Sequence, residues 1–174
     1  MHDVAKPDCR TVDEEGIHHF HGHPEAGAKK AKQILRRLKF DNDTISMVGR
    51  MILYHDRRYE QCYDKGAYCA KGKRGMRRLM NQIGEDAMPF LFLLQKADLL
   101  AQSDYTREEK LAKLSAAVKA WKDVLAFNEA VKVSDLSIGG RDLIRNGIAP
   151  GPGLGEILHY LLEQVLAVSY THLR

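Results

Sequence analysis

A His-Asp pair near the start of the chain and three later residues of the same two types have the chemistry to bind a metal ion together. The pair is His2-Asp3, and the later residues are His23, His55 and Asp98. A His-Asp dipeptide alone is common and means little. Imidazole and carboxylate groups together, however, suit a divalent transition metal, or a magnesium ion that bridges phosphate oxygens. The joint occurrence of these five residues therefore predicts a metal site.

Two of these candidates lie on helical faces that are otherwise apolar. The apolar residues spaced at the helical period are Ile45, Val48 and Ile52 before His55, and Leu91, Leu94 and Ala101 around Asp98. Burying a carboxylate without a partner is costly, so Asp98 implies a metal or a strong hydrogen-bond donor. The alternatives are that His55 is a satisfied core histidine and that Asp98 only hydrogen-bonds to a neighbouring helix.

His23 belongs to a dense histidine cluster that also contains His18, His19 and His21. It directly precedes Pro24, and proline is tolerated in the first turn of a helix. We therefore expect His23 at the N-cap of a helix, where its position is fixed. Two or three of the four clustered histidines are expected to be only solvated loop residues, and His23 is the best candidate ligand.

The second candidate site is a basic segment between positions 57 and 78. It holds eight basic and two acidic residues, interleaved with tyrosines. This combination suits a phosphate backbone with bases that can stack, although a solvated loop with excess charge is an equal alternative. The residues predicted to contact phosphate are Lys71, Lys73, Arg74, Arg77 and Arg78.

A glycine-rich turn offers a third candidate site. Gly151, Gly153 and Gly155 precede or open a predicted helix. Small residues let the backbone approach a ligand closely, and a helix N-terminus presents unpaired N–H groups to a phosphate. The alternative is a tight turn between two helices.

Composition limits the class of protein. The chain has 174 residues, of which 44% are hydrophobic and 29% charged, with a formal net charge of +4. This length allows one domain or one and a half. No apolar run reaches the ~20 residues of a membrane span, and nothing resembles a secretory signal. The three cysteines imply no disulfide framework, so we expect a cytoplasmic protein without membrane contact.

The hydrophobic periodicity predicts an all-α fold. A polar loop over 8–22 is expected to form a short hairpin, and Pro24 opens the first helix. The other helices are expected over 42–57, 75–83, 86–102, 106 to about 130, 140–146 and 153–168. Thr106 and Glu109 suggest a capping box, and residues 131–138 are expected to be extended.

The order His-Asp, His, His, Asp resembles the HD metal-dependent phosphohydrolase superfamily. More specifically, the chain looks like the C-terminal part of bacterial CCA-adding tRNA nucleotidyltransferases that carry an HD domain. The stretches that carry the resemblance are 2–7, 20–28, 35–40, 96–102, and the run from Gly140 to Leu158. The last run is the most specific to the tRNA enzymes, whereas the others are shared by HD domains in general.

The resemblance implies a division of the chain. Residues 1–104 would form an HD-type helical bundle without its N-terminal helix, and 105–168 a smaller helical tRNA-nucleotidyltransferase region. Residues 169–174 remain unassigned and do not continue the family pattern. The nucleotidyl-transfer head, an upstream histidine ligand and the helix that carries it would be missing, so we expect a fragment. Its partners would be tRNA and that head, and its cofactor a divalent metal such as Mg, Mn or Ni.

Three hypotheses about function follow. In the first, the chain is the tRNA-supporting portion of a CCA-adding enzyme. In the second, it is a free-standing HD phosphohydrolase acting on nucleotides or cyclic phosphates, in which a metal activates water. In the third, it is a structural remnant that holds an RNA-binding surface without metal. The C-terminal run separates the first from the second, and metal content separates the second from the third.

Overall fold

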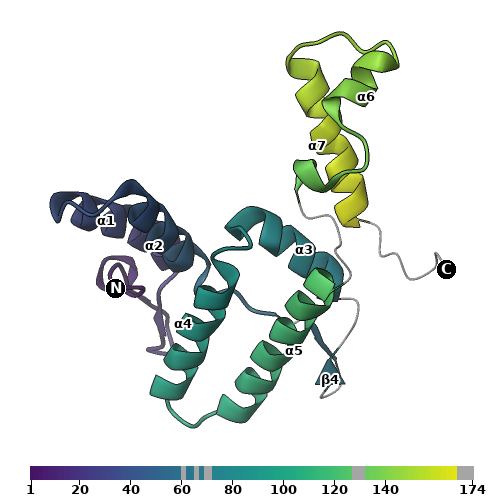
Figure 1. Ribbon diagram of the computed structural model, residues 1–174. Coiled ribbons are helices and arrows are strands. Elements are labelled where there is room, and N and C mark those ends of the chain that lie inside the picture. The colour runs from purple at the N-terminus through teal and green to yellow at the C-terminus, as the bar shows by residue number, and fades with distance from the viewer. Residues whose placement is uncertain (60–61, 65–66, 69–71, 127–131, 168–174) are drawn as a thin grey trace. The chain divides into compact units, whose positions relative to one another are not determined.

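The computed structural model describes residues 1–59, 62–64, 67–68, 72–126 and 132–167 (Figure 1). Within these residues the chain forms seven α-helices and two antiparallel two-stranded hairpins, which confirms the predicted all-α class. The fold divides into two compact units. The first comprises Met1–Arg58 and Glu85–Arg107, and the second Tyr59–Gly84 and Glu108–Arg174. The predicted domain boundary near residue 104 stays a prediction.

The first unit contains a 3-10 turn, a hairpin and three helices. These are η1 (Pro7–Cys9), β1 (Thr11–Val12), β2 (His18–His19), α1 (His23–Arg37), α2 (Asn42–Tyr54) and α4 (Met88–Ala101). The hairpin pairs Thr11 with His19 and Val12 with His18, so the hairpin predicted over 8–22 is confirmed. Gly16, which closes the turn, has a φ of 79° that favours glycine.

Helices α1 and α2 pack closely through small residues. The core between them consists of Ala28, Ala31 and Ile52, with Val48 and Leu53 packed against it. A Cβ atom on Gly27 would lie 3.2 Å from Ile52 Cγ2, which shows how near the two helices approach at this point. This contact fixes the start of α1 relative to the end of α2.

The helix ends follow from local chemistry. Gly22, with a φ of 75°, is the N-cap of α1. The prediction that His23 is the N-cap was therefore wrong by one residue, because the left-handed backbone there favours glycine. Asp41 caps α2, where its side chain accepts a hydrogen bond from the Thr44 N–H. Helix α2 ends at Tyr54, three residues before the predicted end at position 57, and His55 is its C-cap.

The second unit contains a short hairpin and four helices. These are β3 (Tyr63–Asp64), β4 (Ala67–Tyr68), α3 (Gly72–Ile83), α5 (Arg107–Ala126), η3 (Val133–Asp135), α6 (Gly140–Arg145) and α7 (Pro152–Ala167). The 3-10 turn η3 occupies part of the segment that was expected to be extended. Thr106 has a φ of 56° and its hydroxyl donates to the Tyr105 carbonyl oxygen, instead of forming the predicted capping box.

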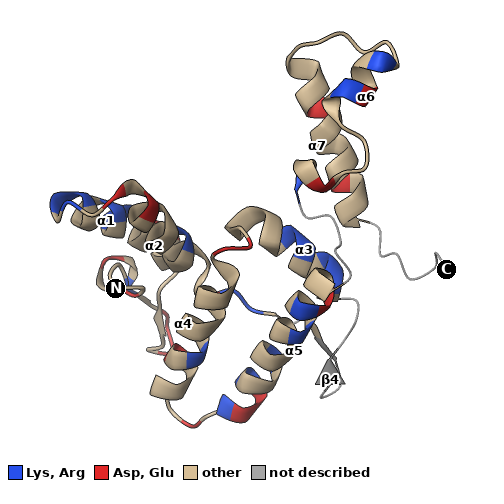
Figure 2. Ribbon diagram, viewed as in Figure 1, with Lys and Arg blue, Asp and Glu red and all other residues tan. Residues whose placement is uncertain are grey.

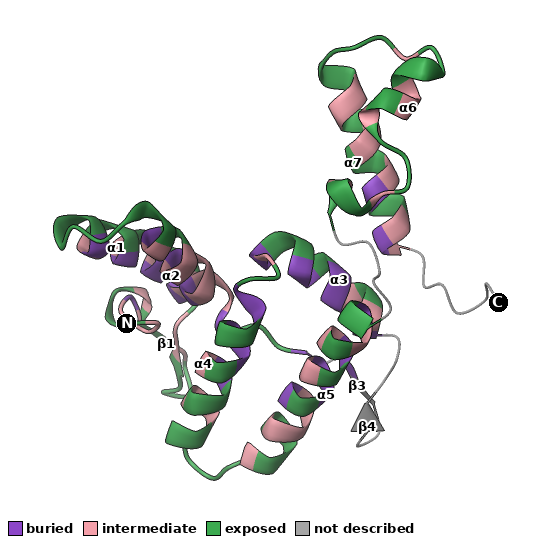
Figure 3. Cartoon of the chain, viewed as in Figure 1, coloured by how far each residue is buried: buried purple, intermediate pink, exposed green. Residues whose placement is uncertain are grey.

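Burial differs strongly between helices of the second unit. Figure 3 shows buried residues along α3 and α5, whereas α6 has none. Helix α7 buries only Leu162 and Leu166, toward its C-terminal end. Helices α6 and α7 therefore leave much apolar surface open. Of the helices that the structure describes, none has the length and apolar character needed to cross a membrane.

The Asp41 cap generates a prediction about pH. Hydrogen bonds from the Thr44 hydroxyl and backbone N–H lower the pKa of Asp41. A lowered pKa in the folded state contributes stability above the unfolded pKa, which is lost as the pH falls through the folded one. We expect Asp41→Ala to lower the melting temperature at pH 7, with a smaller difference from the native chain at pH 3. Asp41→Asn, which keeps the acceptor, should lower it less at pH 7. Equal differences at both pH values in thermal melts would contradict this account.

Candidate metal centre

The first unit brings all five predicted ligands together. His2 and Asp3 precede η1, His23 is the first residue of α1, His55 follows α2, and Asp98 lies in α4. They form two groups that share Asp3, one with His23 and His55 and the other with His2 and Asp98. Within each group the candidate ligand atoms all lie within 4.8 Å of one another. The expected convergence is therefore present in the fold, while metal binding itself stays a prediction.

The inner group is tightly spaced, and its two histidines are buried. The Nε2 atoms of His23 and His55 lie 3.2 Å apart. Asp3 Oδ1 lies 3.4 Å from His55 Nε2 and 3.7 Å from His23 Nε2. The exposed fractions of His23 and His55 are only 6% and 9%. Three potential ligand atoms thus face one another away from bulk water.

Backbone hydrogen bonds define which nitrogen of each inner histidine carries a proton. His23 Nδ1 lies 2.7 Å from the Phe20 carbonyl oxygen, and His55 Nδ1 lies 2.6 Å from the Ile52 carbonyl oxygen. Because a carbonyl oxygen only accepts, both Nδ1 atoms must donate. In the neutral rings, both Nε2 atoms therefore present lone pairs to each other and to the Asp3 carboxylate.

Such a set of acceptors is stabilised by a positive charge, which a metal ion or a proton on one imidazole would supply. Asp3 Oδ1 is buried and has no hydrogen-bond partner among the described residues. Two nitrogen lone pairs and a carboxylate oxygen repel one another unless a positive charge lies between them. A histidine that ligates a metal usually donates its other ring N–H to a carbonyl or carboxylate, as both rings do here. The inner group therefore fits a divalent cation.

The outer group is more open to solvent. His2 Nε2 lies 3.3 Å from Asp3 Oδ2 and 3.4 Å from Asp98 Oδ1. Lys6 donates to Asp3 Oδ2 over 2.7 Å, and the Gln102 amide donates to Asp98 Oδ2 over 2.7 Å. The side chains of His2, Asp3 and Asp98 are 27–36% exposed, so a small molecule in solution can reach this side of the cluster.

Lys6 is a member of the site that the sequence reasoning missed. Burial by itself raises the pKa of Asp3, but the hydrogen bond from Lys6 and nearby positive charges outweigh burial and lower it. The Lys6 ammonium also lies 5.8 Å from the centre of the Phe20 ring, which is a cation–π distance. Its spacing of three residues from Asp3 was the available signal, because that spacing brings side chains together in a helical turn.

The remaining histidines of the hairpin lie outside both groups. The Arg10 guanidinium donates to His18 Nδ1 over 3.0 Å. His19 Nε2 lies 2.6 Å from Asp13 Oδ2, and the His19 ring stacks on His21 with ring centres 5.4 Å apart. These contacts give His18 and His19 partners within the hairpin, while His18 and His21 are exposed, in line with the expectation of solvated histidines.

The predicted phosphate-binding residues belong to the second unit. Lys71 lies outside the described residues. Lys73 and Arg74 are in the first turn of α3, and Figure 2 shows Lys and Arg residues along this helix. Arg74 is exposed and Lys73 is half-buried, so both can reach a ligand at the surface.

Two other arginines of α3 differ in accessibility. Arg77 has an exposed fraction of 1%, so it is not part of the exposed basic surface. Arg78 is exposed and lies 3.8 Å from Glu163 of α7. Tyr59, one of the interleaved tyrosines, is also buried and therefore cannot stack on a base at the surface.

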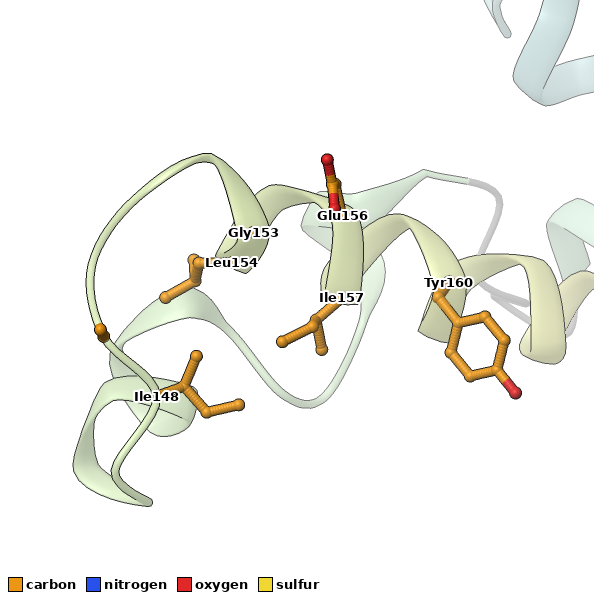
Figure 4. Close-up of a pocket in the computed structure, with 7 residues that line it drawn as sticks. Ile148, Gly153, Leu154, Glu156, Ile157 and Tyr160 are labelled. Atoms are coloured by element: carbon orange, nitrogen blue, oxygen red, sulfur yellow. The ribbon is translucent and has the colours of Figure 1, made fainter.

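The glycine-rich turn borders an open hollow that sequence reasoning did not predict. Gly151 precedes α7 with a φ of 156°, and Gly153 and Gly155 lie in its first turns. The hollow has a volume of about 560 Å³, and Figure 4 shows Ile148, Leu154 and Ile157 converging on it. Its full lining is Ile148, Ala149, Gly153, Leu154, Glu156, Ile157 and Tyr160. The sequence signal that could have predicted the hollow is the three-residue spacing of Leu154 and Ile157, which places both side chains on one face of α7.

The inner group predicts a specific response to metal. Adding Mn²⁺ at a hundred times its Kd should stabilise the folded chain by about 2.7 kcal/mol, because the ion binds only the folded state. His23→Ala should remove this stabilisation in thermal melts. His21→Ala is the matched control, since His21 is exposed and belongs to neither ligand group. If Mn²⁺ still raises the melting temperature of His23→Ala, the ion does not bind at the inner group.

Comparison with known proteins shows what the chain is similar to. A family model described as tRNA nucleotidyltransferase domain 2 matches residues 14–169. The chain is 30% identical over 169 residues to the CC-adding tRNA nucleotidyltransferase of Thermus thermophilus, covering 94% of this chain and 34% of that protein. It is 27% identical over 165 residues to the A-adding tRNA nucleotidyltransferase of Deinococcus radiodurans. This match covers 94% of this chain and 35% of that protein.

The match covers only part of those relatives. The chain spans about a third of the length of the two curated relatives. No solved structure matches the chain. The family model nevertheless covers most of the sequence, including all seven α-helices of the described residues. The chain therefore belongs to the tRNA nucleotidyltransferase domain 2 family.

Proposed function

We propose that this chain is the HD-type, metal-binding and tRNA-contacting part of a cytoplasmic CCA-adding tRNA nucleotidyltransferase. The observation that carries the proposal is that a nucleotidyltransferase family model spans most of a chain that also assembles five His and Asp ligands. The relatives named as CC-adding and A-adding enzymes are about three times longer than the matched region. We therefore assign the nucleotidyl-transfer reaction to parts of such a protein that this match does not cover.

The HD assignment rests on the order and convergence of the ligands. The sequence order His2-Asp3, His23, His55, Asp98 is the HD-like order, and these side chains meet within the first unit. A divalent cation held by them would act as a Lewis acid on a phosphate oxygen. The protein's own part is to hold each inner imidazole in the tautomer that presents Nε2.

The charges around the outer group suit a phosphate. Lys6 places an ammonium group against Asp3 Oδ2, at the more exposed side of the cluster. His2 lies at hydrogen-bond range of the two carboxylates and is exposed enough to meet a ligand. These groups would neutralise and orient an incoming phosphate beside the cation. Substrates of the phosphate ester class therefore match the site.

The tRNA-contacting role rests on the second unit. Lys73, Arg74 and Arg78 provide positive charge on α3, to which Lys71 adds a further candidate outside the described residues. The turn formed by Gly151 and Gly153 lies at the N-terminus of α7, where backbone N–H groups lack helical partners. Phosphate contacts of this kind bind RNA without reading its sequence.

A second candidate function is a free-standing HD phosphohydrolase acting on nucleotides or cyclic phosphates. The observation that favours it is the open side of the metal centre, where His2, Asp3 and Asp98 are 27–36% exposed. Hydrolysis of a nucleoside 2′,3′-cyclic phosphate with added Mn²⁺, Ni²⁺ or Mg²⁺ tests it directly. Strong activity that chelators and Asp3→Asn both abolish, without tRNA binding, would favour this function over the first.

Binding of tRNA should be mainly electrostatic. If four to six phosphates are contacted, log affinity falls linearly with log salt, because each neutralised phosphate releases counterions. We expect the double change Lys73→Ala and Arg74→Ala to lower the magnitude of that slope by about two. The matched control is Lys29→Ala with Arg36→Ala, two exposed basic residues of α1. Filter binding of tRNA across a salt series measures the slope for the double variant and for the control. If the double variant and the native chain have the same slope, α3 does not contact the RNA.

The glycine turn should respond differently from the basic residues. A Cβ atom on Gly153 would meet nothing within 4 Å, so Gly153→Val is compatible with the fold. The added side chain should obstruct close approach of RNA to the helix N-terminus. We expect weaker tRNA binding with most of the salt slope retained. Unchanged tRNA binding in this variant and in the α3 double variant would contradict tRNA contact by these two parts of the second unit.

A further inference from the structure

Gln95 is a buried polar residue that connects two of the helices bearing metal-site residues. It lies on α4, three residues before Asp98, with an exposed fraction of 7%. Its amide nitrogen donates to the His55 carbonyl oxygen over 2.9 Å and approaches the Arg57 carbonyl oxygen at 3.4 Å. One helix therefore supplies both the ligand Asp98 and a hydrogen bond to the main chain of the ligand His55.

This hydrogen bond is made at the C-terminal end of α2, where carbonyl groups lack partners within the helix. The last four carbonyl groups of a helix have no partner within the helix, and His55 lies directly after the end of α2. A buried carbonyl there needs a donor from another element. Gln95 provides this donor, so it holds the turn after Tyr54 in a defined conformation.

The conformation of that turn determines where the imidazole of His55 points. His55 Nδ1 donates to the Ile52 carbonyl oxygen, which lies one turn back in α2. The ring is thus oriented by the main chain of its own helix end, and Gln95 fixes that main chain from α4. His55 Nε2 consequently stays 3.2 Å from His23 Nε2 and 3.4 Å from Asp3 Oδ1.

The chemistry at this position requires an amide. The two oxygens that Gln95 faces are both carbonyl acceptors, and an amide NH₂ supplies two donors. An ionised carboxylate of the same shape only accepts and would repel both oxygens. A leucine of similar size keeps the packing but leaves the His55 carbonyl without this donor.

We propose that Gln95 is a positioning residue of the metal centre, which sets the location of His55 Nε2 through the His55 main chain. The inference rests on the proposed metal-binding function. Groups that orient a ligand without touching the ion commonly change metal affinity by 10–100-fold when they are mutated. Gln95 acts on the main chain of the ligand, so we expect a loss of about tenfold, at the lower end of that range.

The test compares Gln95→Leu with a control that lowers stability elsewhere. Leu35→Ala is the control, because Leu35 is a buried core residue near the far end of α1 from His23. Co²⁺ affinity and the Co²⁺ absorption bands are measured on the full chain. Gln95→Leu should weaken Co²⁺ binding about tenfold and alter the bands, whereas Leu35→Ala should leave both unchanged. Native affinity and bands in a folded Gln95→Leu chain would overturn the proposal.

A second readout works without metal. Imidazole resonances of the metal-free chain report the ring environment of each histidine. Gln95→Leu should shift or broaden the His55 signals and leave those of His18 in the hairpin unchanged. If Gln95→Leu does not fold, Gln95→Met keeps an unbranched side chain of similar length and removes the amide donors. Failure of the native chain to bind Co²⁺ would overturn the metal function, while unchanged His55 signals would overturn the role of Gln95.

Discussion

The candidate site of the first unit depends on three acceptor atoms that face one another: Nε2 of His23, Nε2 of His55 and Oδ1 of Asp3. Both inner imidazoles commit their Nδ1 protons to backbone carbonyls, so their Nε2 lone pairs meet beside an oxygen of Asp3. Hydrogen bonds within the described residues do not satisfy that oxygen. A positive charge at this point, either a metal ion or a proton on one imidazole, would relieve the repulsion among the three atoms.

Each helix of the first unit contributes through its end or its inward face. Helix α1 begins at His23, α2 ends just before His55, and α4 presents Asp98 together with Gln95. The carbonyls that orient the two rings lie at these helix ends: Phe20 precedes α1, and Ile52 is in the last turn of α2. The close packing of α1 on α2, through small residues such as Ala28 and Ala31, keeps the two histidines in contact.

The second unit has a different character. Its C-terminal helices bury few residues and leave an apolar hollow beside a glycine-rich turn, while α3 carries exposed positive charge. Positive charge suits a phosphate backbone, and aromatic or apolar surface suits bases. The family match, over residues 14–169, includes His23, His55, Asp98 and the second unit's basic helix, whereas His2 and Asp3 lie before it.

The sequence by itself determined the all-α class, most helix positions and the five candidate ligands that the fold brings together, because helical periodicity and residue type are local properties. It placed His55 and Asp98 on inward faces; His55 is buried, whereas Asp98 is 32% exposed. It also misplaced the cap of α1 by one residue and extended α2 by three. Only the tertiary structure decided that Arg77 is buried, that Lys6 contacts Asp3, and that Gln95 reaches the carbonyl of His55. Burial and contacts between distant segments depend on how helices pack, which no local pattern specifies.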